Sequence, residues 1–183
     1  GTKQANYDAT KFNWLGSPSV ETSVVTIWHS SPANTWQDAR TTELRMGSSG
    51  ANSTPSFYAR LLNETLGLKL RLIVGYPGQN DALLAMERGE ADGRCGWSWS
   101  SVKSTQADWL KTGKVQLLLQ LSLSKHPDLP NVPLIMDFAK NDEQRAVLEL
   151  IFARQVMGRP VLAPPGIPAE RVGVIRRAFD ATM

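Results

Sequence analysis

The sequence predicts an α/β domain with a mostly parallel central sheet and flanking helices. Short runs of β-branched and aliphatic residues alternate along the chain with longer segments whose apolar residues recur every three or four positions. Glycine-rich turns connect several of these segments. Short connections of this kind are typical of the strand–helix–strand units from which α/β proteins are built.

The composition is that of a globular protein. Of the 183 residues, 42% are hydrophobic and 20% are charged, which are ordinary proportions for a folded domain. The formal net charge is +3, and the basic residues are scattered among the acidic ones, so we expect no nucleic-acid partner. No apolar run approaches the roughly 20 residues of a membrane-spanning helix. No secretion signal is recognisable, so an exported protein would already have lost it.

The first half of the chain contains two strand–loop–helix repeats. The run from Val24 to Trp28 is β-branched except for the tryptophan and apolar on both faces, which indicates a central strand. Pro55 suits the first position of a helix, and Gly67 suits the residue that ends it. These patterns predict strands at 24–28, 44–46 and 70–74, and helices at 35–41, 55–66 and 79–88.

The second half continues the alternation with weaker boundaries. Gly93 weakens one strand candidate, because glycine is unfavourable inside a strand. Pro127, Pro130 and Pro133 predict an extended surface loop. We expect strands at 91–96, 115–121 and 160–163, and helices from 97 toward 110, at 142–157 and from 167 to 179.

The loop 46–55 has the features of an anion site at a helix N-terminus. Its glycines permit close approach of the backbone, and its hydroxyl side chains add hydrogen-bond donors. At such a helix start the free N–H groups and the positive end of the dipole can hold a carboxylate or phosphate without a lysine. The alternative is a tight turn with a helix cap and no ligand. The candidate ligand-binding residues here are Ser48, Ser49, Gly50, Asn52 and Ser53.

A second glycine-rich turn, 75–78, follows the next predicted strand. In parallel sheets ligands lie beyond the carboxyl ends of the strands, so both turns should meet at one edge. Tyr76 and Gly78 could orient a ligand there. Alternatively, Tyr76 is an ordinary aromatic residue at the edge of the sheet, and Gly78 is an ordinary turn glycine.

Arg94 and two tryptophans complete the set of candidates. Arg94 lies in a predicted strand of small residues, where a buried cation needs a partner. It either pairs with Asp92 or Asp81, or grips a carboxylate of the ligand. Trp97 and Trp99 either belong to the core or provide a stacking wall for a flat ligand.

The sequence contains no recognisable catalytic or metal centre. The loop lacks the Gly-Lys-Ser/Thr of a nucleotide-binding P-loop, and neither His29 nor His126 belongs to a nucleophile motif. The single cysteine, Cys95, excludes multi-cysteine metal sites and reads as a small buried hydrophobe. We therefore expect no metal and no cofactor. The alternative to a binding protein is a small α/β enzyme whose anionic, phosphorylated or acyl substrate is held at the 47–52 helix start.

Several short motifs follow one another along nearly the whole chain. They occupy residues 8–16, 47–50, 76–78, 89–92, 129–133 and 163–168. In their order and rough spacing they resemble the solute-binding receptors of tripartite tricarboxylate transporters, the TctC or Bug family. The resemblance implies a type II periplasmic-binding-protein-like fold, in which two α/β lobes close like a Venus flytrap. It also implies that Ser48, Ser49 and Gly50 donate to a ligand carboxylate and that the turn 76–78 lines the same cleft.

The resemblance further implies a domain organisation and partners. Residues 1–29 would be a lead-in and crossover from the other lobe, 30–158 the ligand-binding lobe, and 159–183 the return crossover with the start of a helix. The opening segment of the first lobe has no counterpart, so we expect a fragment of a longer receptor. That receptor would be a periplasmic non-enzyme whose partners are transporter subunits and a small mono-, di- or tricarboxylate, aromatic ones included.

Overall fold

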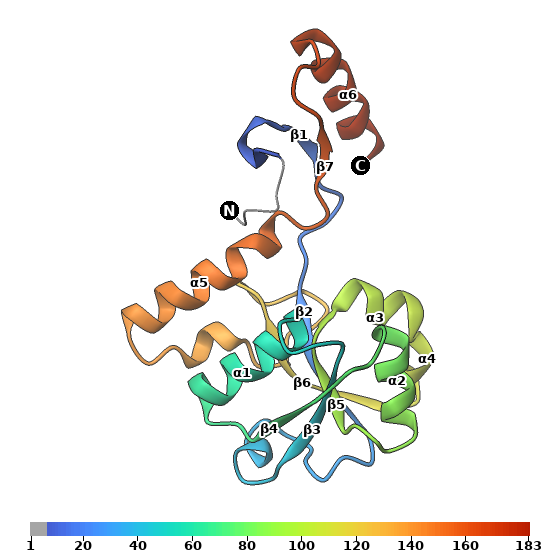
Figure 1. Cartoon of the computed structure of the whole chain (residues 1–183), viewed down its shortest axis with the longest axis vertical. Coiled ribbons are helices and arrows are strands. Elements are labelled where there is room, and N and C mark those ends of the chain that lie inside the picture. Colours follow the sequence, from blue (N-terminus) through green and yellow to red (C-terminus); the bar gives the residue numbers. More distant parts are fainter. Residues whose placement is uncertain (1–6) are drawn as a thin grey trace. The chain divides into compact units, whose positions relative to one another are not determined.

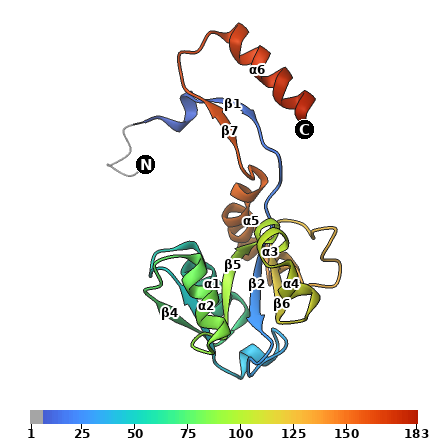
Figure 2. The same ribbon diagram turned by 90° about the vertical axis from the view of Figure 1, so that its right-hand side faces the viewer.

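The computed structural model describes residues 7–183, which form two compact units (Figures 1 and 2). The larger unit is Thr22–Ala153, and the smaller one combines residues 7–21 with residues 154–183. The chain therefore divides at 21/22 and 153/154. The lobe organisation implied by the resemblance, with 1–29, 30–158 and 159–183, stays a prediction. In the described part of the chain, every helix is too short or too polar to cross a membrane.

The larger unit is built on a five-stranded sheet in the order β4-β3-β5-β2-β6. β3 pairs in parallel with β4 and β5, whereas β2 is antiparallel to both of its neighbours, β5 and β6. Four strands therefore run in one direction and β2 runs in the other, so the α/β class is confirmed and the sheet is mixed, with two parallel and two antiparallel pairings. The strands are β2 (Ser23–Trp28), β3 (Leu44–Ser48), β4 (Leu70–Val74), β5 (Gly93–Ser98) and β6 (Val115–Leu121).

Helices cover both faces of this sheet (Figure 1). On one face, Val25 and Ile27 of β2 share a core with α1 and with the part of α5 up to Ala153. On the other face, Val24 and Trp28 share a second core with α2, α3 and α4. This alternation along β2 follows from the period of two in a strand. The helices are α1 (Thr54–Leu66), α2 (Gln79–Glu87), α3 (Trp99–Thr105), α4 (Ala107–Lys111) and α5 (Asp142–Val156).

Most elements of the larger unit lie where the sequence predicts them. β4 and β6 coincide with the expected ranges, and α1 ends at Gly67, whose φ of 67° is the expected left-handed C-cap. The expected helix at 35–41 is wrong, because the segment forms only a 3-10 turn, Asp38–Arg40. The Asp38 carboxylate accepts hydrogen bonds from the N–H groups of Asn34 and Thr35, which holds the chain in a compact turn.

The largest departure from prediction lies around β5. The expected strand 91–96 continues to Ser98, so residue 97 does not begin a helix. Gly96 has a φ of 70°, and the pairing with β2 shifts register between the partners Val24 and Thr26. This irregularity is a bulge and not a stop, so the chain remains in the sheet. The expected single helix is in fact two short ones, α3 and α4, separated at Gln106.

The smaller unit pairs β1 (Asn13–Gly16) antiparallel with β7 (Val161–Ala163), followed by α6 (Ala169–Thr182). Its buried apolar cluster consists of Leu15, Ala163 and Val172. Arg176 of α6 donates from Nε to the carbonyl oxygen of Trp14 at 2.7 Å. α6 is therefore fastened to β1 by this hydrogen bond and by the small apolar cluster.

Candidate functional site

A cavity of about 220 Å³ lies where β3 and β4 end and α1 and α2 begin. Three segments build it: the loop after β3, the turn after β4 and one side chain from β5. The two glycine-rich turns thus meet at one edge of the sheet, as expected for parallel neighbours. The lining residues are Gly47, Ser48, Ser49, Pro55, Pro77, Gly78, Gln79, Ala82 and Arg94.

Three serines form the frame of the first loop. Ser53 and Ser56 each place their Oγ 2.7 Å from the carbonyl oxygen of Gly50. The Oγ of Ser48 lies 2.7 Å from that of Ser53 and 2.8 Å from that of Ser56. Since each hydroxyl has one proton, all three protons have acceptors inside the cluster. These side chains shape the loop, and the donors that remain for a ligand are mainly backbone N–H groups.

Both helix starts at the cavity lack a side-chain cap. Ser53 is the N-cap residue of α1, but its hydroxyl is bonded to the Gly50 carbonyl and does not cap the helix. The N-cap of α2 is Gly78, which has no side chain to offer. The first-turn N–H groups of a helix normally find such a partner. Here two helix N-termini with their positive dipole ends border one cavity.

Arg94 is nearly fully buried, with 7% of its surface exposed, and it lines the cavity. Its Nε and Nη1 atoms are buried without a hydrogen-bond partner among the described residues. Burial lowers the pKa of the guanidinium to about 10, so Arg94 stays charged at neutral pH. Arg94 is the second residue of β5 and therefore lies near the start of this strand.

One of the alternatives for Arg94, an ion pair with Asp92, is wrong, because Asp92 is bound to Arg45. The Asp92 carboxylate accepts from Arg45 Nη2 at 2.8 Å, from Nε at 3.0 Å and from the backbone N–H of Arg45 at 2.7 Å. These charge-assisted bonds occupy both carboxylate oxygens. Asp81 forms no ion pair with Arg94 either, as far as the described residues show.

The Asp92→Asn variant should lose about 1–3 kcal/mol of unfolding free energy, because the buried Asp92 side chain would lose its charge-assisted hydrogen bonds with the partly exposed Arg45. Urea unfolding of the two proteins measures the difference. The control is Glu43→Gln, which breaks the exposed pair with Arg71 and should change stability by less than about 0.5 kcal/mol. Equal losses in the two variants would contradict a special role for the Arg45–Asp92 pair.

Both candidate tryptophans lie in the core. Trp97 is fully buried and Trp99 is 7% exposed. Neither lines the cavity, so neither can act as the stacking wall for a ligand held there. The Trp97 ring instead supports Arg94 from below, with its centroid 5.6 Å from Cζ.

The other predicted residues surround the cavity without lining it. Gly50 contributes its carbonyl to the serine cluster, and Asn52 is exposed outside the lining. Tyr76 packs beside Gly47, and burial, together with the charge of Glu90, raises the pKa of its hydroxyl. At this turn the lining is made by Pro77, Gly78 and Gln79.

The sequence reasoning missed Ser56 and Gln79. Ser56 lies three residues after Ser53 in the first turn of α1, a spacing that brings both hydroxyls to one side of the helix start. Gln79 is the first residue of α2 and lines the cavity. The signal for both was their position in the first turn of a helix, next to the two glycine-rich turns.

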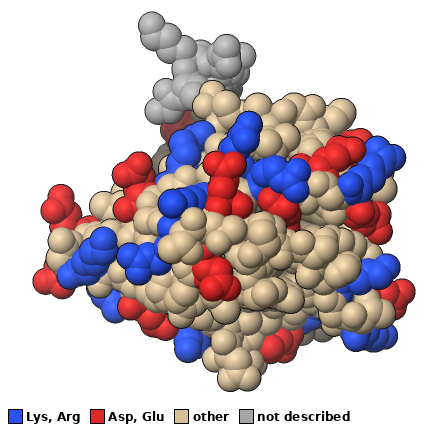
Figure 3. Space-filling view, turned by 90° about the horizontal axis from the view of Figure 1, so that it is seen from below, with Lys and Arg blue, Asp and Glu red and all other residues tan. Residues whose placement is uncertain are grey.

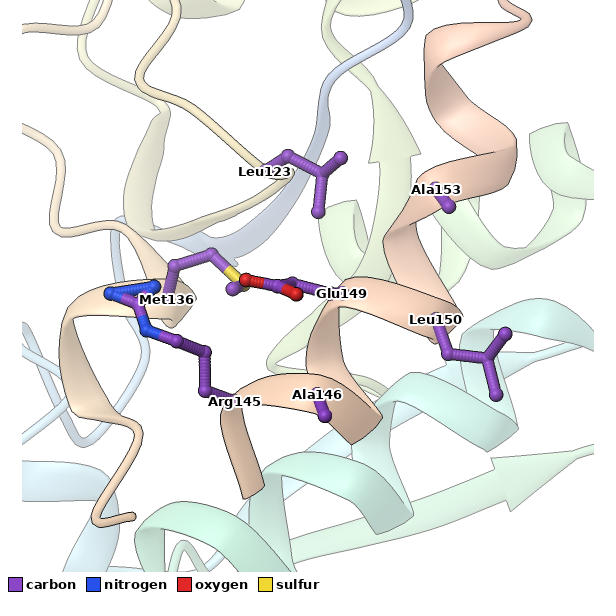
Figure 4. A pocket seen from close by; sticks show the side chains of 7 residues that line it. All are labelled: Leu123, Met136, Arg145, Ala146, Glu149, Leu150 and Ala153. Atoms are coloured by element: carbon purple, nitrogen blue, oxygen red, sulfur yellow. The ribbon is translucent and has the colours of Figure 1, made fainter. Parts of the chain in front are cut away.

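Another cavity, of about 500 Å³, lies along α5 (Figure 4). Arg145 and Glu149 both extend toward Met136, whereas Leu150 points away from them. This cavity therefore contains both signs of charge. On the face drawn in Figure 3 basic and acidic side chains are also interspersed. The site around Arg94 differs from both surfaces, because its lining contains one cation and no acid.

Comparison with solved structures shows what the fold is similar to. A TctC solute-binding protein from Polaromonas matches 97% of the chain with a TM-score of 0.64 and 20% identity. A protein from R. palustris with adipate matches 94% with a TM-score of 0.63 and 18% identity. MatC from Rhodopseudomonas palustris with bound malate matches 98% with a TM-score of 0.62 and 17% identity.

The chain spans 57%, 55% and 57% of the length of these three proteins. No family model and no curated protein matches the sequence. The similarity extends over nearly the whole chain and covers the sheet with its flanking helices. The chain therefore has the α/β fold of periplasmic solute-binding proteins, and its structural neighbours include those of the TctC and Bug type.

Proposed function

We propose that the chain is the ligand-binding part of an extracytoplasmic receptor that captures a small organic carboxylate for a tripartite tricarboxylate-type transporter. The observation that carries the proposal is the cavity at which two uncapped helix N-termini meet. Such a site offers several N–H donors and a positive potential to an anion. Two of the structural neighbours contain adipate or malate.

The composition of the lining favours a carboxylate head over a nucleotide phosphate. The site has two glycine-rich turns, two prolines and one guanidinium, but it has no P-loop lysine. The carboxylate would accept hydrogen bonds from the backbone N–H groups near Ser49 and Gly78 and from the hydroxyl of Ser49. The rest of the ligand would extend out of the cavity, which is lined mostly by small residues.

A binding role fits the site better than catalysis does. The hydroxyl protons of Ser48 and Ser53 have acceptors inside the cluster, and the lining contains no histidine or acid that could activate Ser49. The structural neighbours include a periplasmic transporter and the periplasmic binding protein BugD, which supports a place outside the cytoplasm. In this proposal the membrane partners are the transporter subunits that accept the solute.

A thermal-shift screen tests the proposal directly. Adipate, malate and a panel of mono-, di- and aromatic carboxylates are added to the protein at constant ionic strength, with adipamide and malamide as neutral controls. A carboxylate at a hundred times its Kd should stabilise the protein by about 2.7 kcal/mol, which corresponds to a rise in Tm of about 5–10 °C for a chain of this size. Absence of stabilisation by every mono-, di- and aromatic carboxylate tested would refute the proposal.

A further inference from the structure

We propose that Arg94 is an unpaired cation at the cavity that forms an ion pair with the anionic head of the ligand. It would make the site select charged ligands over neutral ones of the same shape. This inference rests on the proposed function and goes beyond it. Binding at the two helix starts alone would accept any group with hydrogen-bond acceptors. Arg94 adds a requirement for a full negative charge.

The first step is the position of the guanidinium. Arg94 lines the cavity, and only 7% of its surface is exposed. Nε and Nη1 are both buried and have no hydrogen-bond partner among the described residues. The side chain is held in this position by the Trp97 ring below it, 5.6 Å from Cζ.

The second step is that Arg94 forms no ion pair with any acid among the described residues. The carboxylate closest in sequence, Asp92, is fully engaged by Arg45. Asp81 places Oδ2 beside Gly78 at the start of α2, but it forms no ion pair with Arg94. In the cavity along α5, by contrast, Arg145 is accompanied by Glu149. Of the two cavities, the one at the helix starts is therefore the one with an unbalanced positive charge.

The third step is energetic. Burying an unpaired charge in a protein interior costs free energy, so most buried charges have a partner of opposite charge. The two helix N-termini beside Arg94 add positive potential and raise the cost further. An anion in the cavity would relieve this cost, whereas a neutral amide would leave the guanidinium unpaired. The empty protein is thus destabilised by the same group that would bind the ligand.

This argument predicts opposite effects of one substitution on stability and on binding. Arg94→Met keeps a long side chain over Trp97 and removes the charge. The unliganded variant should have a Tm equal to or higher than that of the wild type, since an unpaired buried charge is replaced by an apolar group. Its affinity for adipate should fall by about 10- to 100-fold, the range expected for loss of a charge-assisted hydrogen bond.

The experiment measures Kd for adipate and for adipamide by calorimetric titration, and Tm without ligand, for the wild type, Arg94→Met and Arg94→Lys. We expect the wild type to prefer adipate by about 10-fold or more, Arg94→Met to lose that preference and Arg94→Lys to retain part of it. These results, with an undiminished Tm for Arg94→Met, support the inference.

Two results would overturn it. Equal affinity of Arg94→Met and the wild type for adipate shows that the charge does not contact the ligand head. A Tm lowered by several degrees in Arg94→Met but retained in Arg94→Lys shows that the guanidinium has a structural partner. If no carboxylate of the thermal-shift screen binds the wild type, the proposed function fails together with this inference, whereas the two results above leave the proposed function intact.

Discussion

The Gly93→Ala variant is expected to lose about 3 kcal/mol or more of unfolding free energy, near the upper end for overpacking of a core position. A Cβ atom at Gly93 would lie 2.2 Å from the carbonyl oxygen of Thr26 and 3.0 Å from Cα of Ile27. Both are backbone atoms of β2 in the middle of the sheet, so they cannot move aside. Urea unfolding measures the effect as a lower midpoint at unchanged slope.

Gly50→Ala is the matched control for this experiment. It makes the same chemical change at a position where a Cβ atom meets nothing within 4 Å and where φ is not in the positive region. We expect its midpoint to stay within about 1 kcal/mol of the wild type. If the two variants unfolded at the same urea concentration, the close approach of β5 and β2 at Gly93 would not matter for stability.

The Ser49→Asp variant is expected to lose carboxylate binding by at least 100-fold. Ser49 lines the cavity and is exposed, so an aspartate can be accommodated without disturbing the core. Its charge would lie beside the ligand head, where two like charges about 4 Å apart repel by about 4 kcal/mol at an effective dielectric constant of 20. The new carboxylate would also neutralise the positive potential that the ligand uses. Titration with adipate measures the loss.

Ser49→Asn separates charge from size in this test. Asparagine has nearly the same shape as aspartate but no charge, so its affinity for adipate should fall much less. The Tm of Ser49→Asp without ligand should be unchanged or higher, because an acid near a helix N-terminus is favourable. Undiminished binding by Ser49→Asp would show that the loop after β3 is a turn and not part of the site.

The elements with strong periodicity could be predicted from the sequence, and those decided by tertiary contacts could not. β4, β6 and α1 depend on runs of apolar residues and on glycine or proline at their ends, which are local signals. β5 depends on its neighbours. Gly93 reads as a weakness in a strand, yet it is the residue that permits the approach to β2. Gly96 reads as a stop, yet its positive φ forms a bulge inside the strand.

The site was predictable in its place and only partly in its chemistry. Parallel-sheet topology brings the two glycine-rich turns to one edge, so Ser48, Ser49 and Gly78 could be placed together from the sequence. The partner of Asp92 could not be predicted, because Arg45 lies 47 positions away in the chain and reaches Asp92 from the neighbouring strand β3. Because Asp92 is bound to Arg45, it does not pair with Arg94. No local pattern in the sequence predicts this choice of partner.

The serine cluster separates the residues that hold the loop in shape from the groups that would bind a ligand. The hydroxyls that stand out in the sequence hold one another and the Gly50 carbonyl in place before a ligand arrives. The loop then meets a ligand in a fixed shape, and little ordering is required of it on binding. In the proposed binding mode, the anion contacts peptide N–H groups, the Ser49 hydroxyl and the Arg94 guanidinium, and every residue except proline carries such an N–H group. Binding of the anionic head would therefore not depend on the identity of most side chains around it. Such a frame can serve ligands with one kind of head and many kinds of tail.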